Sequence, residues 1–343
     1  MDALGDRRRQ AVRPALCQLG GGLLAAALGI GPAAATDQPP LIVQLDGPLG
    51  AQFAGYYVAD YQGFYDEAEV AVTLVPGDEQ VDITPAVAAG VANLVIERMP
   101  AALAAREHGV ELVNIGQFFA RPALEVVCRK DSGVAAPADL RGRRLGLWTD
   151  EARVAMLAWL GGQGLADGIE LVDQGHEPSL LLGRRADCIS ALSWDERAQL
   201  LDAGVAPEEL TVLAAADHGP APLEDGVWVP AKLLESRHTV LSLAGFLYAT
   251  RRGWSWARDN PVEAVRIVQE YDHAKTLQEK PQVRRMHEIN RLTEGTGGML
   301  DPAAFQATVD LLLAAPGERA ITRRPEGAWT HGPAEEAGLN EPE

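Results

Sequence analysis

The alternation of short apolar runs with helical runs, from residue 41 to about residue 214, limits the fold of this chain more than any other feature. Runs rich in Val, Ile and Leu that alternate with helical stretches are typical of βαβ units. Such units form mostly parallel sheets covered by helices, so the sequence predicts two successive α/β units. The predicted strands lie at residues 41–45, 70–75, 93–96, 112–116, 123–128, 144–148, 169–172, 188–192 and 210–214.

The last third of the chain changes character and predicts a helical C-terminal part. A chain of 343 residues, 47% of them hydrophobic, is long enough for two lobes with separate cores. Ligands of α/β folds bind beyond the carboxyl ends of parallel strands, which predicts a binding cleft between the lobes. The predicted C-terminal helices lie at residues 236–257, 261–271, 275–293 and 302–315.

Residues 1–35 are typical of an export signal. Basic residues at 7–9 precede an apolar run at 15–30, and small residues at 32–35 provide a cleavage site near Ala35. The alternative is a membrane-anchor helix, but glycines interrupt the apolar run. The arginine pair keeps the twin-arginine export route open. We therefore expect the mature protein in the periplasm.

The mature chain is strongly acidic. Residues 1–35 hold four arginines and two aspartates, so the remainder carries 26 basic and 46 acidic side chains and a net charge of −20. Such a surface repels nucleic acid and anionic lipid, so we expect no nucleic-acid partner, and the simplest explanation of the charge is solubility. Two cysteines remain, Cys128 and Cys188, and the sequence leaves open whether they pair.

The sequence contains no recognisable catalytic or metal-binding motif. There is no Gly-x-Ser-x-Gly elbow, no Walker motif and no His-Glu-x-x-His. The glycine-rich segments at 161–164 and 295–298 come after or between helices, so they predict turns and not phosphate loops. The many carboxylates leave an unmarked acid/base pair open. We predict a protein that is not an enzyme and needs no metal or cofactor.

Aromatic and polar residues gather where the predicted strands end. An aromatic face beside a charged or amide group suits a planar heterocycle, because rings sandwich it and polar groups bond its edge. The candidate ligand-binding residues are Gln52, Phe53, Tyr56, Glu97, Arg98, Phe118, Trp148, Trp194, Asp195, Glu196 and Asp225.

Some of these residues have a purely structural alternative. Residues 50–65 hold four of the six tyrosines, and most of this aromatic stripe is predicted to be core. Phe53 and Tyr56, in its first turn, are expected to line the cleft. Trp148 is equally compatible with core and cleft. The acidic pair at 195–196 also fits a helix N-terminus.

Several segments resemble periplasmic solute-binding proteins of ABC transporters, of the family that includes thiamine-pyrimidine synthases and sulfonate- and taurine-binding proteins. The similarity is greatest to the branch that binds thiamine pyrimidine precursors, and it covers residues 41–331. The segments that carry it are 52–65, 70–77, 99–107, 112–117, 127–133, 137–142, 301–305 and 327–331.

The resemblance implies an α/β, type 2 periplasmic-binding-protein fold with two α/β lobes, a hinge and a helical C-terminal part. It implies a discontinuous lobe 1 (40–128 plus 228–331) and a lobe 2 at 129–227, followed by a disordered tail at 332–343. It also implies a monomer that receives a small-molecule ligand and delivers it to an ABC permease with its ATPase.

The leading hypothesis is an exported binding protein for a small planar heterocycle, such as a thiamine pyrimidine precursor. Riboflavin-type and sulfonate-type ligands are alternatives, as are a thiamine-pyrimidine-synthase-like enzyme and a ligand-sensing module. Phe53 stands where the synthase branch has a histidine, and the cysteine-rich cluster of that branch is absent, which argues against the enzyme. In this hypothesis Phe53, Tyr56 and Trp194 stack on the ring, and Glu97 and Arg98 contact a ring substituent.

Overall fold

The computed structural model describes residues 40–77, 86–87, 89–150, 152–295, 297–315, 317 and 319–340. Residues 38–343 form one compact unit. The predicted export signal at residues 1–35 lies outside the described residues. In the part of the chain that is described, no helix is both long enough and apolar enough to cross a membrane.

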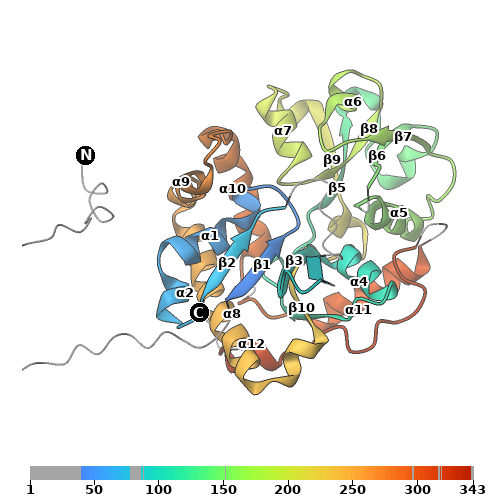
Figure 1. Cartoon of the computed structure of the whole chain (residues 1–343). Helices are drawn as coiled ribbons and strands as arrows, with labels where there is room; N and C mark the ends of the chain where they lie inside the picture. The colour runs from blue at the N-terminus through green and yellow to red at the C-terminus, as the bar shows by residue number, and fades with distance from the viewer. Residues whose placement is uncertain are drawn as a thin grey trace, which may run out of the picture. The chain divides into compact units, whose positions relative to one another are not determined.

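The first sheet has five strands in the order β2-β1-β3-β10-β4 (Figure 1). β1 pairs in parallel with β2 and β3, whereas β10 runs antiparallel to β3 and β4. β10 lies more than 100 residues after β4 in the sequence, so lobe 1 is built from two separate parts of the chain. Its strands are β1 (Leu41–Leu45), β2 (Val72–Val75), β3 (Leu94–Arg98), β4 (Leu112–Gly116) and β10 (Asp225–Pro230).

The second sheet, of lobe 2, has the order β7-β6-β8-β5-β9, with β5 antiparallel to both of its neighbours. The predicted lobe limits, at 128/129 and 227/228, fall near the end of β5 and inside β10. The chain passes between the sheets at residues 117–123 and 215–224. The strands are β5 (Leu124–Arg129), β6 (Arg144–Trp148), β7 (Glu170–Gln174), β8 (Cys188–Leu192) and β9 (Leu210–Ala214).

The buried side chain of Gln117 ties the two connecting segments together. Its Nε2 donates hydrogen bonds to the carbonyl oxygens of Phe119 at 2.8 Å and of Glu224 and Asp225 at 3.0 Å. Phe119 lies in the first passage between the sheets, Glu224 in the second, and Asp225 at the start of β10. One side chain therefore joins the two segments that connect the sheets.

Helices cover the sheets, and the four long C-terminal helices confirm the sequence prediction within a few residues. Ser236 and Asp301 cap α8 and α11 through side-chain oxygens, and a proline begins α9 and α11. The helices are α1 (Ala54–Tyr61), α2 (Phe64–Glu67), α4 (Met99–Glu107), α5 (Ala152–Gly162), α6 (Ser179–Leu182), α7 (Glu196–Asp202), α8 (Arg237–Asp259), α9 (Pro261–Tyr271), α10 (Glu279–Thr293), α11 (Pro302–Ala314) and α12 (Gly332–Glu336).

The tyrosine-rich segment packs against α8 in the core of lobe 1. Tyr56 and Tyr65 both stack on Phe246. Two glycines allow the close approach: a Cβ on Gly55 would lie 2.2 Å from the Trp254 ring, and one on Gly253 would lie 2.1 Å from the carbonyl oxygen of Gly55. Phe53, Tyr56, Tyr57 and Tyr65 are therefore core, whereas Tyr61 is exposed and Phe64 is only partly buried.

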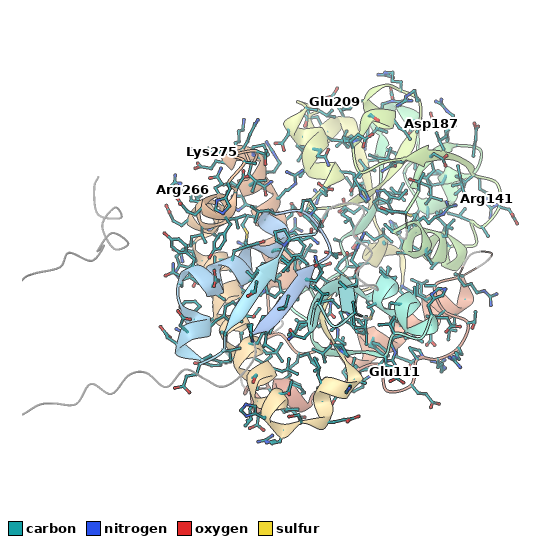
Figure 2. All side chains as sticks on the ribbon, in the orientation of Figure 1. Glu111, Arg141, Asp187, Glu209, Arg266 and Lys275 are labelled. Atoms are coloured by element: carbon teal, nitrogen blue, oxygen red, sulfur yellow. A yellow bond between two sulfur atoms is a disulfide. The ribbon has the colours of Figure 1, made fainter. Side chains whose placement is uncertain are left out.

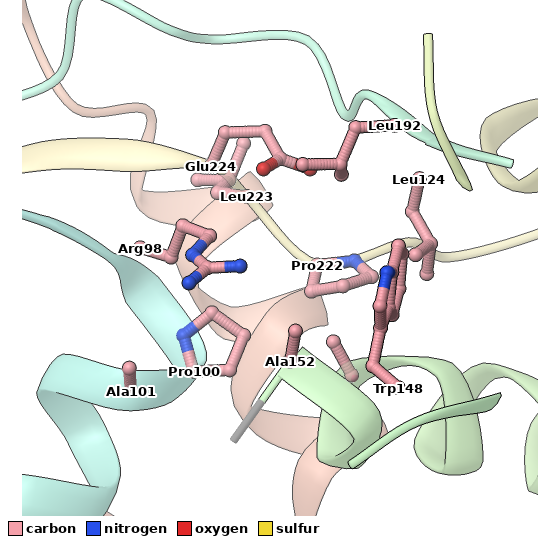
Figure 3. Close-up of a pocket in the computed structure, with 11 residues that line it drawn as sticks. Arg98, Pro100, Ala101, Leu124, Trp148, Ala152, Leu192, Pro222, Leu223 and Glu224 are labelled. Atoms are coloured by element: carbon pink, nitrogen blue, oxygen red, sulfur yellow. The ribbon is translucent and has the colours of Figure 1, made fainter. Parts of the chain in front are cut away.

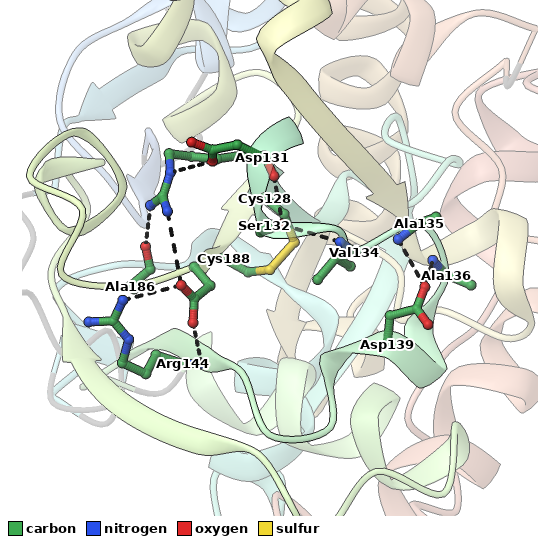
Figure 4. The surroundings of a disulfide bond; sticks show 12 residues. Cys128, Asp131, Ser132, Val134, Ala135, Ala136, Asp139, Arg144, Ala186 and Cys188 are labelled. Atoms are coloured by element: carbon green, nitrogen blue, oxygen red, sulfur yellow. Dashed lines mark hydrogen bonds and ion pairs between the residues drawn. A yellow bond between two sulfur atoms is a disulfide. The ribbon is translucent and has the colours of Figure 1, made fainter.

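Cys128 and Cys188 form a disulfide in lobe 2, which the sequence left open (Figure 4). The two cysteines face each other directly in the antiparallel pairing of β5 with β8. Both are fully buried. The bond therefore staples two central strands of the second sheet.

The prediction of a disordered tail at 332–343 is wrong for residues 332–340. This segment forms α12 and contacts α8, with Ala334 and Leu339 buried. Its apolar residues pack on lobe 1, a contact that a polar, glycine-containing sequence did not indicate.

Candidate functional site

A cavity of about 810 Å³ lies between the lobes. The segments after β1, β3, β6, β7 and β8 and the helix α10 surround it. The carboxyl ends of parallel strands from both sheets thus face one space, as in other α/β binding folds. Its polar and aromatic lining includes Asp46, Gln52, Arg98, Gln282 and Arg285 from lobe 1, and Asp150, His176, Glu177, Trp194, Asp195 and Gln199 from lobe 2.

The lobe 1 wall is a continuous polar network. Asp46 follows β1 and Arg98 ends β3, and because these strands are neighbours both side chains reach the same edge. Arg98 Nε lies 3.3 Å from Asp46 Oδ2, and the two side chains are 20% and 5% exposed. Gln52 Nε2 donates to Asp225 Oδ2 at 2.7 Å and to Asp46 Oδ1 at 3.4 Å. The amide oxygen of Gln52 remains to accept from a ligand.

Four carboxyl groups, of Asp46, Glu97, Glu224 and Asp225, act on the Arg98 charge. Burial raises the pKa of Asp46, against the effect of Arg98, and raises the pKa of Asp225 well above its usual value, with Asp46 adding to the shift. Burial also raises the pKa of Glu224 to about 7. Burial alone would lower the pKa of Arg98, but the carboxylates, Asp46 foremost, shift it upward. The guanidinium therefore stays charged while part of the carboxyl cluster holds protons.

The Glu224→Gln variant is expected to weaken the pH dependence of stability. The folded-state pKa of Glu224, about 7, exceeds its ordinary value of 4.5, so the folded protein binds the extra proton and its unfolding free energy falls as pH rises between these values. Gln keeps an acceptor for the Ala123 amide, which now lies 3.1 Å from Glu224 Oε1. We measure the free energy of unfolding in urea at pH 4.5 and at pH 7.5. Its decrease between the two pH values should be about 2–3 kcal/mol smaller in the variant than in the parent.

Burial raises the pKa of Glu125 to about 7 as well. Glu125 is present in both proteins, so its contribution to the pH dependence is the same in each and cancels in the comparison. Equal pH slopes in the parent and in Glu224→Gln would contradict the assignment of a protonated Glu224.

The lobe 2 wall is formed by Trp194 and Asp195, which directly follow β8. Trp194 is partly exposed at the cavity. Asp195 Oδ1 accepts from Arg285 Nη2 on α10 and from Gln199 Nε2, both at 3.0 Å. Because Arg285 belongs to lobe 1, this ion pair crosses between the lobes. Both hydrogen bonds use Oδ1, so among the described residues Oδ2 is available to accept from a ligand.

His176 also lines the cavity and lies between two carboxylates. Its Nε2 contacts Asp150, and its Nδ1 lies 3.5 Å from Glu196 Oε1. Hydrogen bonds to Asp150 and Glu196 raise the pKa of His176 to about 10, so the ring is an imidazolium at neutral pH. Glu196 is fully buried and accepts from Trp148 Nε1 at 2.7 Å and from the Leu192 amide at 2.9 Å.

The side chains of His176, Asp195 and Glu196 bring potential ligand atoms within 4.8 Å of one another. Without a metal, the His176 ring holds its proton at neutral pH and both carboxylates accept from protein donors, so a metal ion would have to displace that proton and compete with these bonds.

A second cavity, of about 30 Å³, adjoins the first and shares Arg98 and Leu192 with it. Figure 3 shows the Arg98 guanidinium directed into this space, with Trp148, Pro222 and Glu224 around it. Its volume is enough for one small group or a water molecule. Arg98 thus stands between two compartments.

Comparison with known proteins decides the family. A family model described as "NMT1/THI5 like" matches residues 50–264, more than half of the chain. This chain belongs to the NMT1/THI5-like family. The resemblance to that family inferred from the sequence is confirmed.

Two curated proteins similar to this NMT1/THI5-like chain are named after pyrimidines. A formylaminopyrimidine-binding protein of Halalkalibacterium halodurans is 24% identical over 233 residues, 66% of this chain and 68% of that protein. A 4-amino-5-hydroxymethyl-2-methylpyrimidine phosphate synthase of Legionella pneumophila is 27% identical over 89 residues, 26% of this chain. That match spans only 28% of the synthase.

Solved structures confirm the fold. The periplasmic aliphatic sulphonate-binding protein SsuA of Escherichia coli superimposes with a TM-score of 0.64 at 15% identity, over 83% of this chain and 97% of that protein. Several of the similar solved structures are solute-binding proteins, and one is a desulfurization enzyme. The NMT1/THI5-like chain therefore has the two-lobed periplasmic-binding-protein fold, with two mixed sheets.

Four residues predicted from the sequence line the large cavity: Gln52, Arg98, Trp194 and Asp195. Trp148 lines the small one while also bonding Glu196, so it is both buried and adjacent to the site.

Three other predicted residues lie behind the cavity walls. Asp225 binds Gln52, and Glu196 binds Trp148. Glu97 is buried and its Oε1 accepts from the Arg98 amide, so it lines neither cavity. These carboxylates set the charge and position of their neighbours.

The prediction that Phe53, Tyr56 and Phe118 line the cleft is wrong. All three are buried in the lobe 1 core. The 3₁₀ turn at Ala51–Phe53 directs Gln52 outward and Phe53 inward beneath the loop at Gly47. The helix that follows points Tyr56 at Phe118 and the α8 aromatics.

Sequence reasoning missed Asp46, Asp150, His176 and Arg285. The first three follow the strands β1, β6 and β7, so the strand-end rule that found Arg98 could have found them. Arg285 lies on α10, far away in the sequence, and nothing in the local pattern connects it to the cleft.

Proposed function

We propose that this protein is the exported solute-binding component of an ABC importer, which captures a small, planar, amine-bearing heterocycle between its lobes. The cavity shared by both lobes, with a tryptophan wall and open hydrogen-bonding atoms, carries this proposal. The names of the relatives favour a thiamine pyrimidine precursor as the ligand class. We propose that the protein acts as a monomer and delivers its ligand to a permease with its ATPase.

The charges that line the cavity favour an amine over a sulfonate. Three cations are present, and each is paired with a carboxylate: Arg98 with Asp46, His176 with Asp150, and Arg285 with Asp195. Glu177 adds a further carboxylate to the lining. A sulfonate would meet no uncompensated positive charge, and a neighbouring carboxylate would repel it.

The hydrogen-bonding groups suit the edge of an aminopyrimidine. The amide oxygen of Gln52 and Oδ2 of Asp195 accept from amines, and Arg98 donates to a ring nitrogen or carbonyl. Trp194 covers a ring face, which contributes on the order of 1 kcal/mol beyond burial of area. The ring thus needs one aromatic wall, with the polar atoms distributed over both lobes.

The disulfide supports export, since structural disulfides persist in oxidising compartments such as the periplasm.

A ligand panel tests the function. We expect 4-amino-5-hydroxymethyl-2-methylpyrimidine or its N-formylamino analogue to raise the melting temperature and to bind in calorimetry, and taurine not to bind. Trp194→Ala should weaken binding about tenfold or more, because stacking and apolar burial are both lost. Trp256→Ala, at a partly buried position on α8 away from the lining, serves as the control.

Tighter binding of taurine than of any pyrimidine would overturn the charge argument. Riboflavin is included because it is the remaining planar alternative. Folded protein that binds none of these compounds would count against the proposed ligand class.

An enzyme is the second candidate, because one relative carries a synthase name and His176 lies beside two carboxylates. The raised pKa of His176 argues against a role as general base at neutral pH, since the ring already holds its proton. Mass spectrometry of each panel compound after incubation distinguishes binding from turnover.

A further inference from the structure

We propose that a row of ion pairs between α7 and α10 latches the two lobes together before a ligand binds. α7 belongs to lobe 2 and α10 to lobe 1, and the two helices contact each other beside the cavity (Figure 1). The pairs, which we call the interlobe latch, are Arg284 Nε–Asp202 Oδ1 at 2.8 Å, Arg285 Nη2–Asp195 Oδ1 at 3.0 Å and Arg197 Nη2–Glu288 Oε2 at 2.9 Å.

The charges of the latch are complementary. On α10, Arg284 and Arg285 are positive and Glu288 is negative. Each meets an opposite charge within the segment 195–202, namely Asp202, Asp195 and Arg197 in that order. Since like charges that face each other are unfavourable, reversing one member of a pair should weaken this contact between the lobes.

The latch residues are better placed than ordinary surface ion pairs. Their side chains are between 18% and 34% exposed. Arg197 is also anchored in lobe 2, because its Nε lies 2.8 Å from Glu125 Oε2 on β5, a carboxylate that is only 8% exposed. Arg197 is therefore held by the second sheet, so it loses less side-chain conformational entropy when it pairs with Glu288 on α10.

The latch closes the edge of the cavity where Arg285 and Asp195 line it. The lobes also meet through α5 and α11, where Val154, Ala158 and Leu311 belong to one apolar cluster. Charge screening does not weaken that apolar contact, whereas salt screens the latch. Raising salt should therefore loosen the α7–α10 side and open the cavity there.

The latch sets the balance of closed and open forms without any ligand. A partly exposed ion pair shifts such a balance by up to about fivefold. A closed form that is already populated also tightens apparent ligand binding, because less free energy is needed for closure. The inference concerns the free protein, so it stands or falls separately from the proposed ligand.

Small-angle X-ray scattering on ligand-free protein tests the latch. The protein is unfolded in guanidinium with its disulfide intact and refolded, which removes any bound small molecule. We expect the radius of gyration to increase between 20 mM and 500 mM NaCl. Arg284→Asp and Asp202→Arg should each increase it already at 20 mM, and the double variant, with the charges exchanged, should return it to the parent value.

Arg266→Gln is the matched control, since Arg266 makes exposed ion pairs with Glu263 and Glu279 within lobe 1 and lies on the outer surface (Figure 2). It should leave the scattering unchanged. If the folded single variants scatter like the parent, or if the exchanged pair does not restore the compact form, the latch is wrong. Restoration by exchange cannot arise from a general loss of folding, so each outcome decides the question.

Discussion

Replacing Arg98 by Gln is expected to abolish binding of the pyrimidine ligand, with at least a hundredfold loss of affinity, and to lower the unfolding free energy at pH 7 by about 3–5 kcal/mol. Arg98 is the cation that offsets the charges of Asp46, Glu224 and Asp225. Without it these buried carboxyl groups either repel one another or must take up protons. The same change removes the donor that stands between the two cavities.

The pH dependence distinguishes this mechanism from a simple packing defect. Loss of the guanidinium raises the pKa of the neighbouring carboxyls further, so the folded variant binds more protons and loses stability as pH rises. Urea unfolding should show a small difference from the parent near pH 4.5 and a large one near pH 8.

Arg129→Gln is the control for the Arg98 variant. Its side chain is 19% exposed, much like that of Arg98, and it pairs with Asp131 and Asp187 away from the cavity. We expect a loss of about 1 kcal/mol or less and unchanged binding. An equal loss for Arg98→Gln at both pH values would contradict the electrostatic explanation.

Removing the disulfide, by Cys128→Ala with Cys188→Ala, is expected to lower the unfolding free energy by about 3–4 kcal/mol. The bond closes a loop with a sequence separation of 60 residues, which restricts the unfolded chain strongly. The effect should concentrate in lobe 2, because both cysteines lie in its sheet. Guanidinium unfolding followed by tryptophan fluorescence measures it.

Addition of a reducing agent supplies the control for the disulfide. It should bring the parent to the stability of the double variant and leave the double variant unchanged. A loss below 1 kcal/mol, or the same response to reductant in both proteins, would contradict the predicted role.

The order of strands and helices could be predicted because each element shows in the residue pattern of its own segment. The runs at 41–45 and 188–192 are strands, and the C-terminal helices match within a few residues. The antiparallel crossing of β10 and the facing of Cys128 and Cys188 depend on which distant strands become neighbours. Periodicity carries no information on such pairing.

The site was predicted only in part, because some of its residues follow local patterns and others depend on distant packing. Arg98, Trp194 and Asp195 were found because strand ends of parallel sheets share an edge. Phe53 was misplaced because a single 3₁₀ turn inverts the direction of adjacent side chains, so its neighbour Gln52 faces the cavity instead. Arg285 reaches the site only through the packing of a helix from the far end of the chain.

The Gln117 amide has a consequence for how the molecule moves. Because it bonds carbonyls on both connections between the sheets, we expect the two connections to bend together when the lobes move. A single distance between the lobes would then be enough to follow that motion.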